Sequence, residues 1–275
     1  MRLWLPVVVV VAMAVALTAR VTSDGFLSIG RCDADTLGRA YGPLTTIYEV
    51  EDGELAGICH GVDDPAVYRA WSALTAFTTA SERSTIAAFA GFTNTSGKDV
   101  IAYAATLDLA QTEFLVGVDL EMVQLDLPIV RRVMVHEYAH VLTGTAQGAD
   151  RAEPQCASRE NRYGCVTTSN YLGLWVDQFW DQDELAALDT NGYRSASEAN
   201  RRCSQDPGFP STYGATNPSE DFADSLVFFM FSNEVAPAVR PRLQFLSTFP
   251  ELVQMRNRIA AAGLADTRRY VHSCA

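Results

Sequence analysis

Residues 126–144 read DLPIVRRVMVHEYAHVLTG, and this stretch predicts the helix around which the chain is organised. Asp126 supplies an acceptor side chain for a helix start, Pro128 is tolerated in a first turn, and Gly144 is placed to end the helix. At helical spacing two histidines share one stripe with apolar and small neighbours, so we expect both to face inward. The stripe consists of Ile129, Val133, His136, His140 and Thr143.

Within this helix, His136-Glu137-Tyr138-Ala139-His140 has the spacing of a zinc-binding motif. Residues four apart lie almost above one another on a helix, so His136 and His140 can present two imidazoles to one tetrahedral ion. Glu137 then lies beside the metal, where it can act as general base toward the zinc-bound water. The alternative is an amphipathic helix whose histidines are ordinary core residues with backbone or carboxylate partners.

Composition limits the other functions open to the chain. It has 275 residues, of which 48% are hydrophobic and 20% charged, as expected for a folded globular protein. The formal net charge of −12 argues against nucleic acid or an anionic membrane surface as partner, because both need a basic footprint. We expect one domain over 20–275, with an N-terminal layer over about 20–125 and a catalytic helical part over about 126–275.

The first 19 residues are typical of an export signal. Arg2 precedes an apolar run from Leu3 to Leu17, and the small residues Thr18 and Ala19 follow it. An uncleaved membrane anchor is the alternative, and either one places the body of the protein outside the cytoplasm. The sequence therefore predicts a secreted, periplasmic or extracellular protein.

Cysteine usage agrees with export. Six cysteines follow the signal, an even number with no CxxC pair, which favours disulfides over a second metal site. Fifteen pairings are possible and the sequence does not choose among them, although Cys32 with Cys59 and Cys156 with Cys165 are the closest neighbours.

Residue patterns predict a mainly helical α+β fold with a small sheet before the central helix. Strands are expected over 44–50, 100–107 and 114–120. The last alternates like a strand with one better-buried face. It is either a plain structural strand or an edge strand that could pair with an extended peptide substrate. Residues 189–210 are polar and turn-forming. Helices are expected over about 65–80, 85–92, 171–188, 218–232, 238–248 and 251–262.

A catalytic zinc site normally has three protein ligands, so one is missing from the helical motif. A metzincin would place a histidine at position 146, which is Ala146, so that class is excluded. Asp150 or Asp177 stays open on chemical grounds. Glu220 is the better candidate, because Asn217-Pro218 predicts another helix start that puts Glu220 and Asp224 on one face.

In that arrangement Glu220 reaches the metal, and Asp224 hydrogen-bonds the far nitrogen of a ligand histidine. The alternative is that these acids only decorate a helix N-terminus, where negative charge is favourable.

The motif HEYAH, followed about 80 residues later by TYGATNPSEDFAD, resembles the gluzincin metallopeptidases related to the catalytic domain of anthrax lethal factor, including exported bacterial zinc-binding peptidases. The resemblance covers roughly residues 125–232 and implies a zincin-like fold with Glu220 as third zinc ligand. It also implies that Tyr213 stabilises the oxyanion or protonates the leaving group. The family's second acid is usually glutamate, whereas this chain has Asp224, one methylene shorter.

The sequence thus predicts a secreted metallopeptidase that binds one zinc ion, takes protein or peptide substrates and uses Glu137 as general base. Two other functions stay open. One is an exported binding or scaffold protein with a structural zinc site closed by four protein ligands. The other is an amidase with the same metal chemistry that acts on cell-wall peptide.

Overall fold

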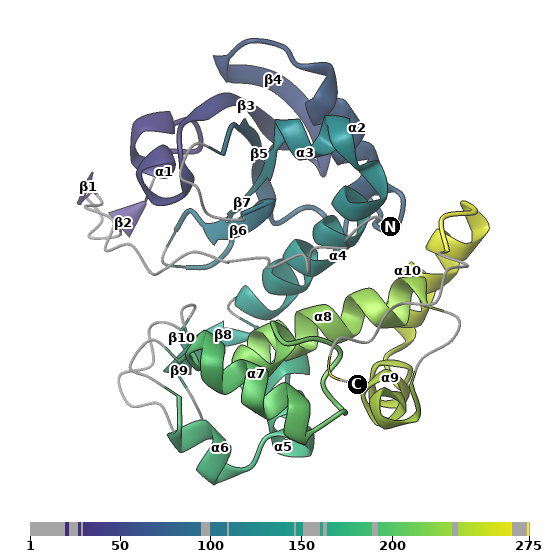
Figure 1. Cartoon of the computed structure of the whole chain (residues 1–275). Coiled ribbons are helices and arrows are strands. Elements are labelled where there is room, and N and C mark those ends of the chain that lie inside the picture. The colour runs from purple at the N-terminus through teal and green to yellow at the C-terminus, as the bar shows by residue number, and fades with distance from the viewer. Residues whose placement is uncertain are drawn as a thin grey trace.

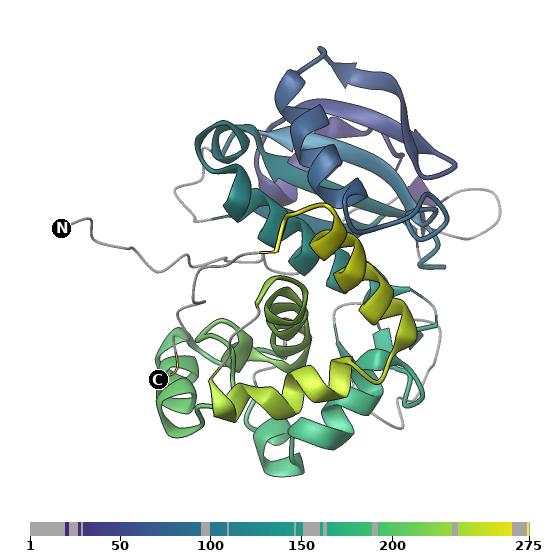
Figure 2. The same cartoon turned by 90° about the vertical axis from the view of Figure 1, so that its right-hand side faces the viewer.

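The computed structural model describes residues 20–21, 27–28, 30–94, 100–108, 110–145, 147–150, 160–161, 164–188, 192–232, 236–265 and 274. Helix α4 (Leu127–Gly144) runs between two halves of the molecule (Figure 1). Above it lie a five-stranded sheet and helices α1 (Ala34–Tyr41), α2 (Pro65–Thr75) and α3 (Leu120–Leu125), and below it lies a helical half (Figure 2). The expected α+β class is confirmed.

The sheet has the strand order β4-β3-β5-β7-β6, in which β5 and β7 are parallel and the other neighbours antiparallel. Its helix-facing side packs on α2 and α4 in one continuous apolar core, and α1 covers part of the other side. The strands are β3 (Leu44–Glu51), β4 (Glu54–Gly61), β5 (Ile86–Phe92), β6 (Ala102–Thr106) and β7 (Phe114–Asp119).

One prediction for the sheet was wrong, and one open alternative is decided. The helix expected over 85–92 is strand β5, whose seven residues IAAFAGF are all buried. A short apolar run that is buried on both faces has no period that separates strand from helix. The run 114–120 is not an edge strand, because β7 lies between β5 and β6, so a substrate cannot pair with it there.

The helix expected over 65–80 ends at Thr75. Beyond it the chain turns, and the buried guanidinium of Arg83 binds the carbonyls of Thr78 at 2.6 Å and Gly53 at 2.8 Å. These contacts stabilise a polar turn in place of the last part of the expected helix.

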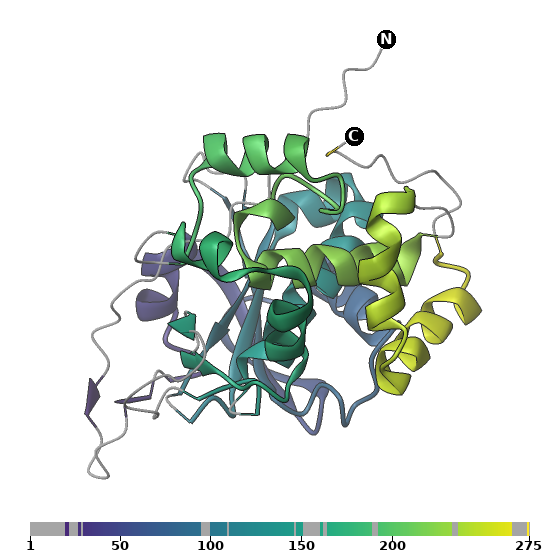
Figure 3. The same cartoon turned by 90° about the horizontal axis from the view of Figure 1, so that it is seen from below.

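The lower half consists mainly of helices, seen from below in Figure 3. Helix α8 is buried along nearly all its length and packs against α4, α5, α9 and α10. The elements are β8 (Ala149–Asp150), β9 (Glu160–Asn161), β10 (Gly164–Val166), α5 (Tyr171–Phe179), α6 (Gln182–Ala186), α7 (Ala196–Gln205), η1 (Gly214–Thr216), α8 (Pro218–Phe231), η2 (Pro237–Val239), α9 (Arg240–Leu246) and α10 (Pro250–Ala261).

Local capping explains where this half departs from the predicted helices. The helix expected over 171–188 is two helices, because Asp181 begins α6 with a capping box. Helix α7 lies inside the stretch expected to be only polar and turn-forming, and it begins with the capping box of Ser195 and Glu198. That S-x-x-E pattern is a sequence signal for a helix start, so α7 could have been predicted.

Two disulfides are described, Cys32–Cys59 and Cys203–Cys274. The first confirms one of the two close pairs, whereas Cys156 lies outside the described residues, so its pairing with Cys165 stays a prediction. Disulfides are compatible with an extracellular protein. The predicted signal over residues 1–19 also lies outside the described part. Within the described part, no helix combines the length and the apolar character that a membrane crossing requires.

Candidate metal site

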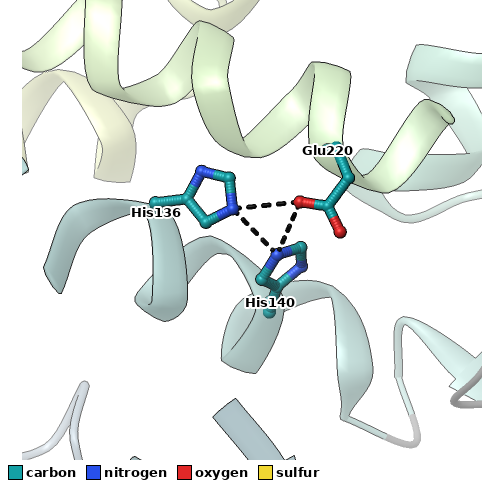
Figure 4. Close-up of side chains that lie close together, drawn as sticks. All are labelled: His136, His140 and Glu220. Carbon is teal, nitrogen blue, oxygen red and sulfur yellow. Dashed lines mark hydrogen bonds and ion pairs between the residues drawn. The ribbon is translucent and has the colours of Figure 1, made fainter. Parts of the chain in front are cut away.

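Three side chains from two helices converge between α4 and α8 (Figure 4). His136 and His140 come from α4, and Glu220 comes from the first turn of α8. Glu220 Oε2 lies 3.0 Å from His136 Nε2 and 3.1 Å from His140 Nε2, and the two Nε2 atoms are 3.2 Å apart. Among the described residues, this is the one group of three or more potential ligands that could hold a metal ion.

The start of α8 explains how Glu220 reaches the histidines. Asn217 caps the helix, and its side-chain oxygen accepts hydrogen bonds from the backbone N–H groups of Ser219 at 2.9 Å and Glu220 at 3.1 Å. Pro218 occupies the first turn, as predicted from the sequence. Because α8 packs along α4, its first turn directs Glu220 toward the two imidazoles.

The triangle of ligand atoms fits a tetrahedral ion. Bonds of about 2.0–2.1 Å, usual for zinc with imidazole and carboxylate, give a tetrahedron with edges of about 3.3 Å. The three observed separations of 3.0 to 3.2 Å come close to that edge. Two imidazole nitrogens and one carboxylate oxygen also suit zinc better than calcium or magnesium, which prefer all-oxygen sites.

Asp224 makes the contact predicted for it, despite its shorter side chain. Its Oδ1 lies 2.9 Å from His136 Nδ1. A neutral His136 that donates from Nδ1 to this carboxylate keeps a lone pair on Nε2, which faces the Glu220 oxygen. Without a cation, the Glu220 oxygen would face this lone pair, and of the two ring nitrogens beside it only His140 Nε2, 3.1 Å away, could donate a hydrogen bond. The arrangement therefore favours a positive charge at the centre of the triangle, either a proton or a metal ion.

Burial and charge act in opposite directions on these groups. Burial alone would lower the pKa of His136, but its hydrogen bonds to Asp224 and Glu220 raise that pKa well above the usual value. Burial alone would raise the pKa of Glu220, but the neighbouring charge of His140 and hydrogen bonds from both histidines bring it well below the usual value. Glu220 is therefore a carboxylate, the form that binds metals.

The two residues expected to act on the substrate are Glu137 and Tyr213. Glu137 follows His136 on α4, and none of its side chain is exposed. The Tyr213 ring, in the turn before η1, is half-buried with its centroid 5.7 Å from that of His136. The structure thus brings together His136, His140 and Glu220, with Asp224 and Tyr213 against His136. The alternative ligand Asp177 is exposed on α5 and belongs to no such group.

Sequence reasoning missed two polar residues beside the site. Ser211 donates a hydrogen bond to Asp224 Oδ2, and Asp221 is fully buried on α8 directly after Glu220. No spacing rule identifies a loop serine. Asp221 is one of three acids in the segment SEDFAD, and the sequence predicted roles only for the other two, Glu220 and Asp224.

Comparisons with known proteins found no similar protein. No protein-family model matches the chain. Searches of curated proteins and of solved structures likewise find no match.

Proposed function

We propose that this chain is a secreted zinc metallopeptidase of the gluzincin type, with a zincin-like fold. The observation that carries the proposal is the triangle of His136, His140 and Glu220, formed by segments some 80 residues apart in the sequence. Its size and donor types support one zinc ion. The resemblance of both motifs to gluzincins, and the two disulfides, support the enzyme class and export respectively.

The mechanism assigns a separate task to each residue around the triangle. A zinc ion held by the three ligands would supply a Lewis acid that lowers the pKa of a water molecule and polarises the scissile carbonyl. Glu137 accepts the proton of that water and passes it to the leaving amine. Tyr213 donates a hydrogen bond to the carbonyl oxygen as negative charge develops there. Asp224 holds the Nδ1 proton of His136, so that Nε2 stays free to bind.

The ligand side chains and the proposed base are buried, whereas Asp224 and Tyr213 beside them are partly exposed. His140, Glu137 and Glu220 are all 0% exposed. A water-poor site strengthens hydrogen bonds and charge interactions at the reacting groups.

The decisive experiment combines metal analysis with a survey of cleavage. We expect the purified chain to contain one zinc per molecule and to cleave peptides in a mixed proteome digest. Glu137→Gln should keep the zinc and lose about 10²–10⁴-fold in rate, because it removes the base but no ligand. Glu121→Gln, at an exposed glutamate of α3, is the matched control and should cleave normally.

Each other result points to a different function. A chain without zinc would contradict the metal site itself. Zinc held by a fourth protein ligand, without cleavage, would favour the scaffold alternative. Cleavage of cell-wall peptide but not of the proteome digest would favour the amidase. Normal peptide cleavage by Glu137→Gln would overturn the assignment of the base.

A further inference from the structure

The turn that carries Tyr213 is bound to the carboxylate that orients His136. Ser211 Oγ donates a hydrogen bond to Asp224 Oδ2, while Asp224 Oδ1 lies 2.9 Å from His136 Nδ1. The two oxygens of Asp224 thus have different partners, one in the loop before α8 and one on α4. Because Asp224 lies on α8, its carboxylate joins three separate pieces of the chain.

A second contact fixes the direction of the serine proton. The backbone N–H of Gly214 donates to Ser211 Oγ at 2.8 Å. With that lone pair occupied by a donor, the hydroxyl proton of Ser211 points to Asp224. The hydrogen bonds then run in one direction, from Gly214 through Ser211 to Asp224, and bonds arranged in such a chain polarise and strengthen one another.

These hydrogen bonds also involve the turn that contains Tyr213. Tyr213 lies between Ser211 and Gly214 in sequence, inside the turn that the Ser211 hydroxyl closes. Thr216 completes the turn, because its N–H and its hydroxyl donate to the Tyr213 carbonyl at 3.0 and 2.6 Å. The same hydroxyl therefore restrains Tyr213 and the Asp224–His136 pair.

We propose that Ser211 is a positioning residue that couples the Tyr213 turn to the Asp224–His136 pair. One hydroxyl then contributes both to metal affinity, through the orientation of His136, and to turnover, through the placement of Tyr213. This inference rests on the proposed zinc peptidase function and extends it to a residue that touches neither metal nor substrate.

The test compares Ser211→Ala with Ser211→Thr, which keeps the hydroxyl. The first readout is zinc affinity, measured by competition with a chromophoric chelator. Ser211→Ala should weaken it by about tenfold, the lower end of the range for partners of ligand histidines, and Ser211→Thr should restore it. Ser204→Ala, which removes an exposed hydroxyl of α7 bonded to the Asn200 carbonyl, should keep wild-type affinity.

Two further measurements separate positioning from a general loss of structure. In an Asp224→Ala background, Ser211→Ala should cause no additional loss of zinc affinity, because the partner of the hydroxyl is already absent. At saturating zinc, Ser211→Ala should lower kcat with KM unchanged.

A wild-type chain that binds no zinc would reject the proposed function. A zinc-binding wild type with a Ser211→Ala variant of equal affinity and equal kcat would reject this inference alone. An equal loss of affinity in both backgrounds would also overturn it, because the loss would then not pass through Asp224.

Discussion

The first turn of α8 separates two buried regions of opposite character. On one side Glu220 faces His136 and His140, and the three atoms that meet there are all potential metal ligands. On the other side Asp221, equally buried, belongs to an anchor that we define as Asp221, Trp175, Trp180 and Arg242. Both carboxylates are 0% exposed, and they are neighbours in sequence.

The anchor supplies all its own donors. Both indole N–H groups donate to Asp221 Oδ2 at 3.0 Å, and Arg242 Nε donates to Oδ1 at 2.9 Å. These donors come from α5, from the residue that caps its C-terminus and from α9, so the anchor ties two segments to α8. Asp221 therefore has a permanent cation, Arg242, and donors on both of its oxygens, which is the arrangement of a structural acid. Glu220 instead faces two imidazole nitrogens that can bind a metal ion, so it is the candidate for function.

The largest expected effect breaks the anchor. Arg242→Leu leaves Asp221 buried without its cation and should lower the free energy of unfolding by about 3–5 kcal/mol. Urea denaturation of zinc-loaded and zinc-free protein should show the same loss, because the anchor needs no metal. Arg240→Leu, at the exposed arginine of the same helix, should change stability by less than about 0.5 kcal/mol. A loss confined to the zinc-loaded protein would instead make the anchor part of the metal centre.

Removal of the metal tests the other side of α8. At free zinc of 100 times Kd, binding stabilises the folded state by about 2.7 kcal/mol, which corresponds to about 5–11 °C in Tm. A chelator should abolish this gain in the wild type. Glu220→Gln, with its charged ligand removed, should show a much smaller difference between the two conditions. An unchanged wild-type Tm in calorimetry, with and without chelator, would contradict a metal site in the folded core.

Asp224→Ala sharpens the comparison, because it alters the metal centre and leaves the anchor intact. Zinc affinity should fall by about 10–100-fold, or about 1.4–2.7 kcal/mol, since His136 loses the acceptor that holds its Nδ1 proton. Titration calorimetry measures the change. Asp177→Ala removes an exposed acid of α5 and should bind zinc normally, whereas a comparable loss there would revive Asp177 as the ligand.

The smallest expected effect concerns the pH dependence of the free energy of unfolding, measured on metal-free protein. Asp221 and Glu220 should contribute to this pH dependence with opposite signs. Burial raises the pKa of Asp221 above 3.8, although Arg242 and the two indoles oppose the shift. The folded state then holds the Asp221 proton more tightly than the unfolded state. Its contribution to stability therefore falls as pH rises from 3.8 through the folded pKa.

Glu220 behaves in the opposite way. Its folded pKa lies well below 4.5, so its contribution is present above 4.5 and is lost as pH falls through the folded pKa. Each of the two groups changes the free energy of unfolding by at most about 1.4 kcal/mol per pH unit. Urea denaturation between pH 3 and 6, in roughly unit steps, should show that Glu220→Gln and Asp221→Asn change the slope in opposite directions. Changes of the same sign would contradict this assignment of environments.

Local patterns determined much of the site. The spacing of His136 and His140 needs only a helix, and Asp126, Pro128 and Gly144 mark where that helix begins and ends. Asn217 and Pro218 likewise mark the start of α8, so Glu220 could be named as a candidate ligand. These are interactions within one or two turns, whose geometry follows from the chain itself.

Only the tertiary structure decided which acids face which partners. Strand β5 is a strand because its neighbours β3 and β7 bind it on both sides, and no local period of IAAFAGF indicates that. Glu220 and Asp221 are adjacent acids with the same local context, yet the packing of α4 on one side and of α5 and α9 on the other gives them opposite surroundings. The physical reason is that burial and charge depend on neighbours brought from distant segments, and those neighbours are fixed only when the helices pack.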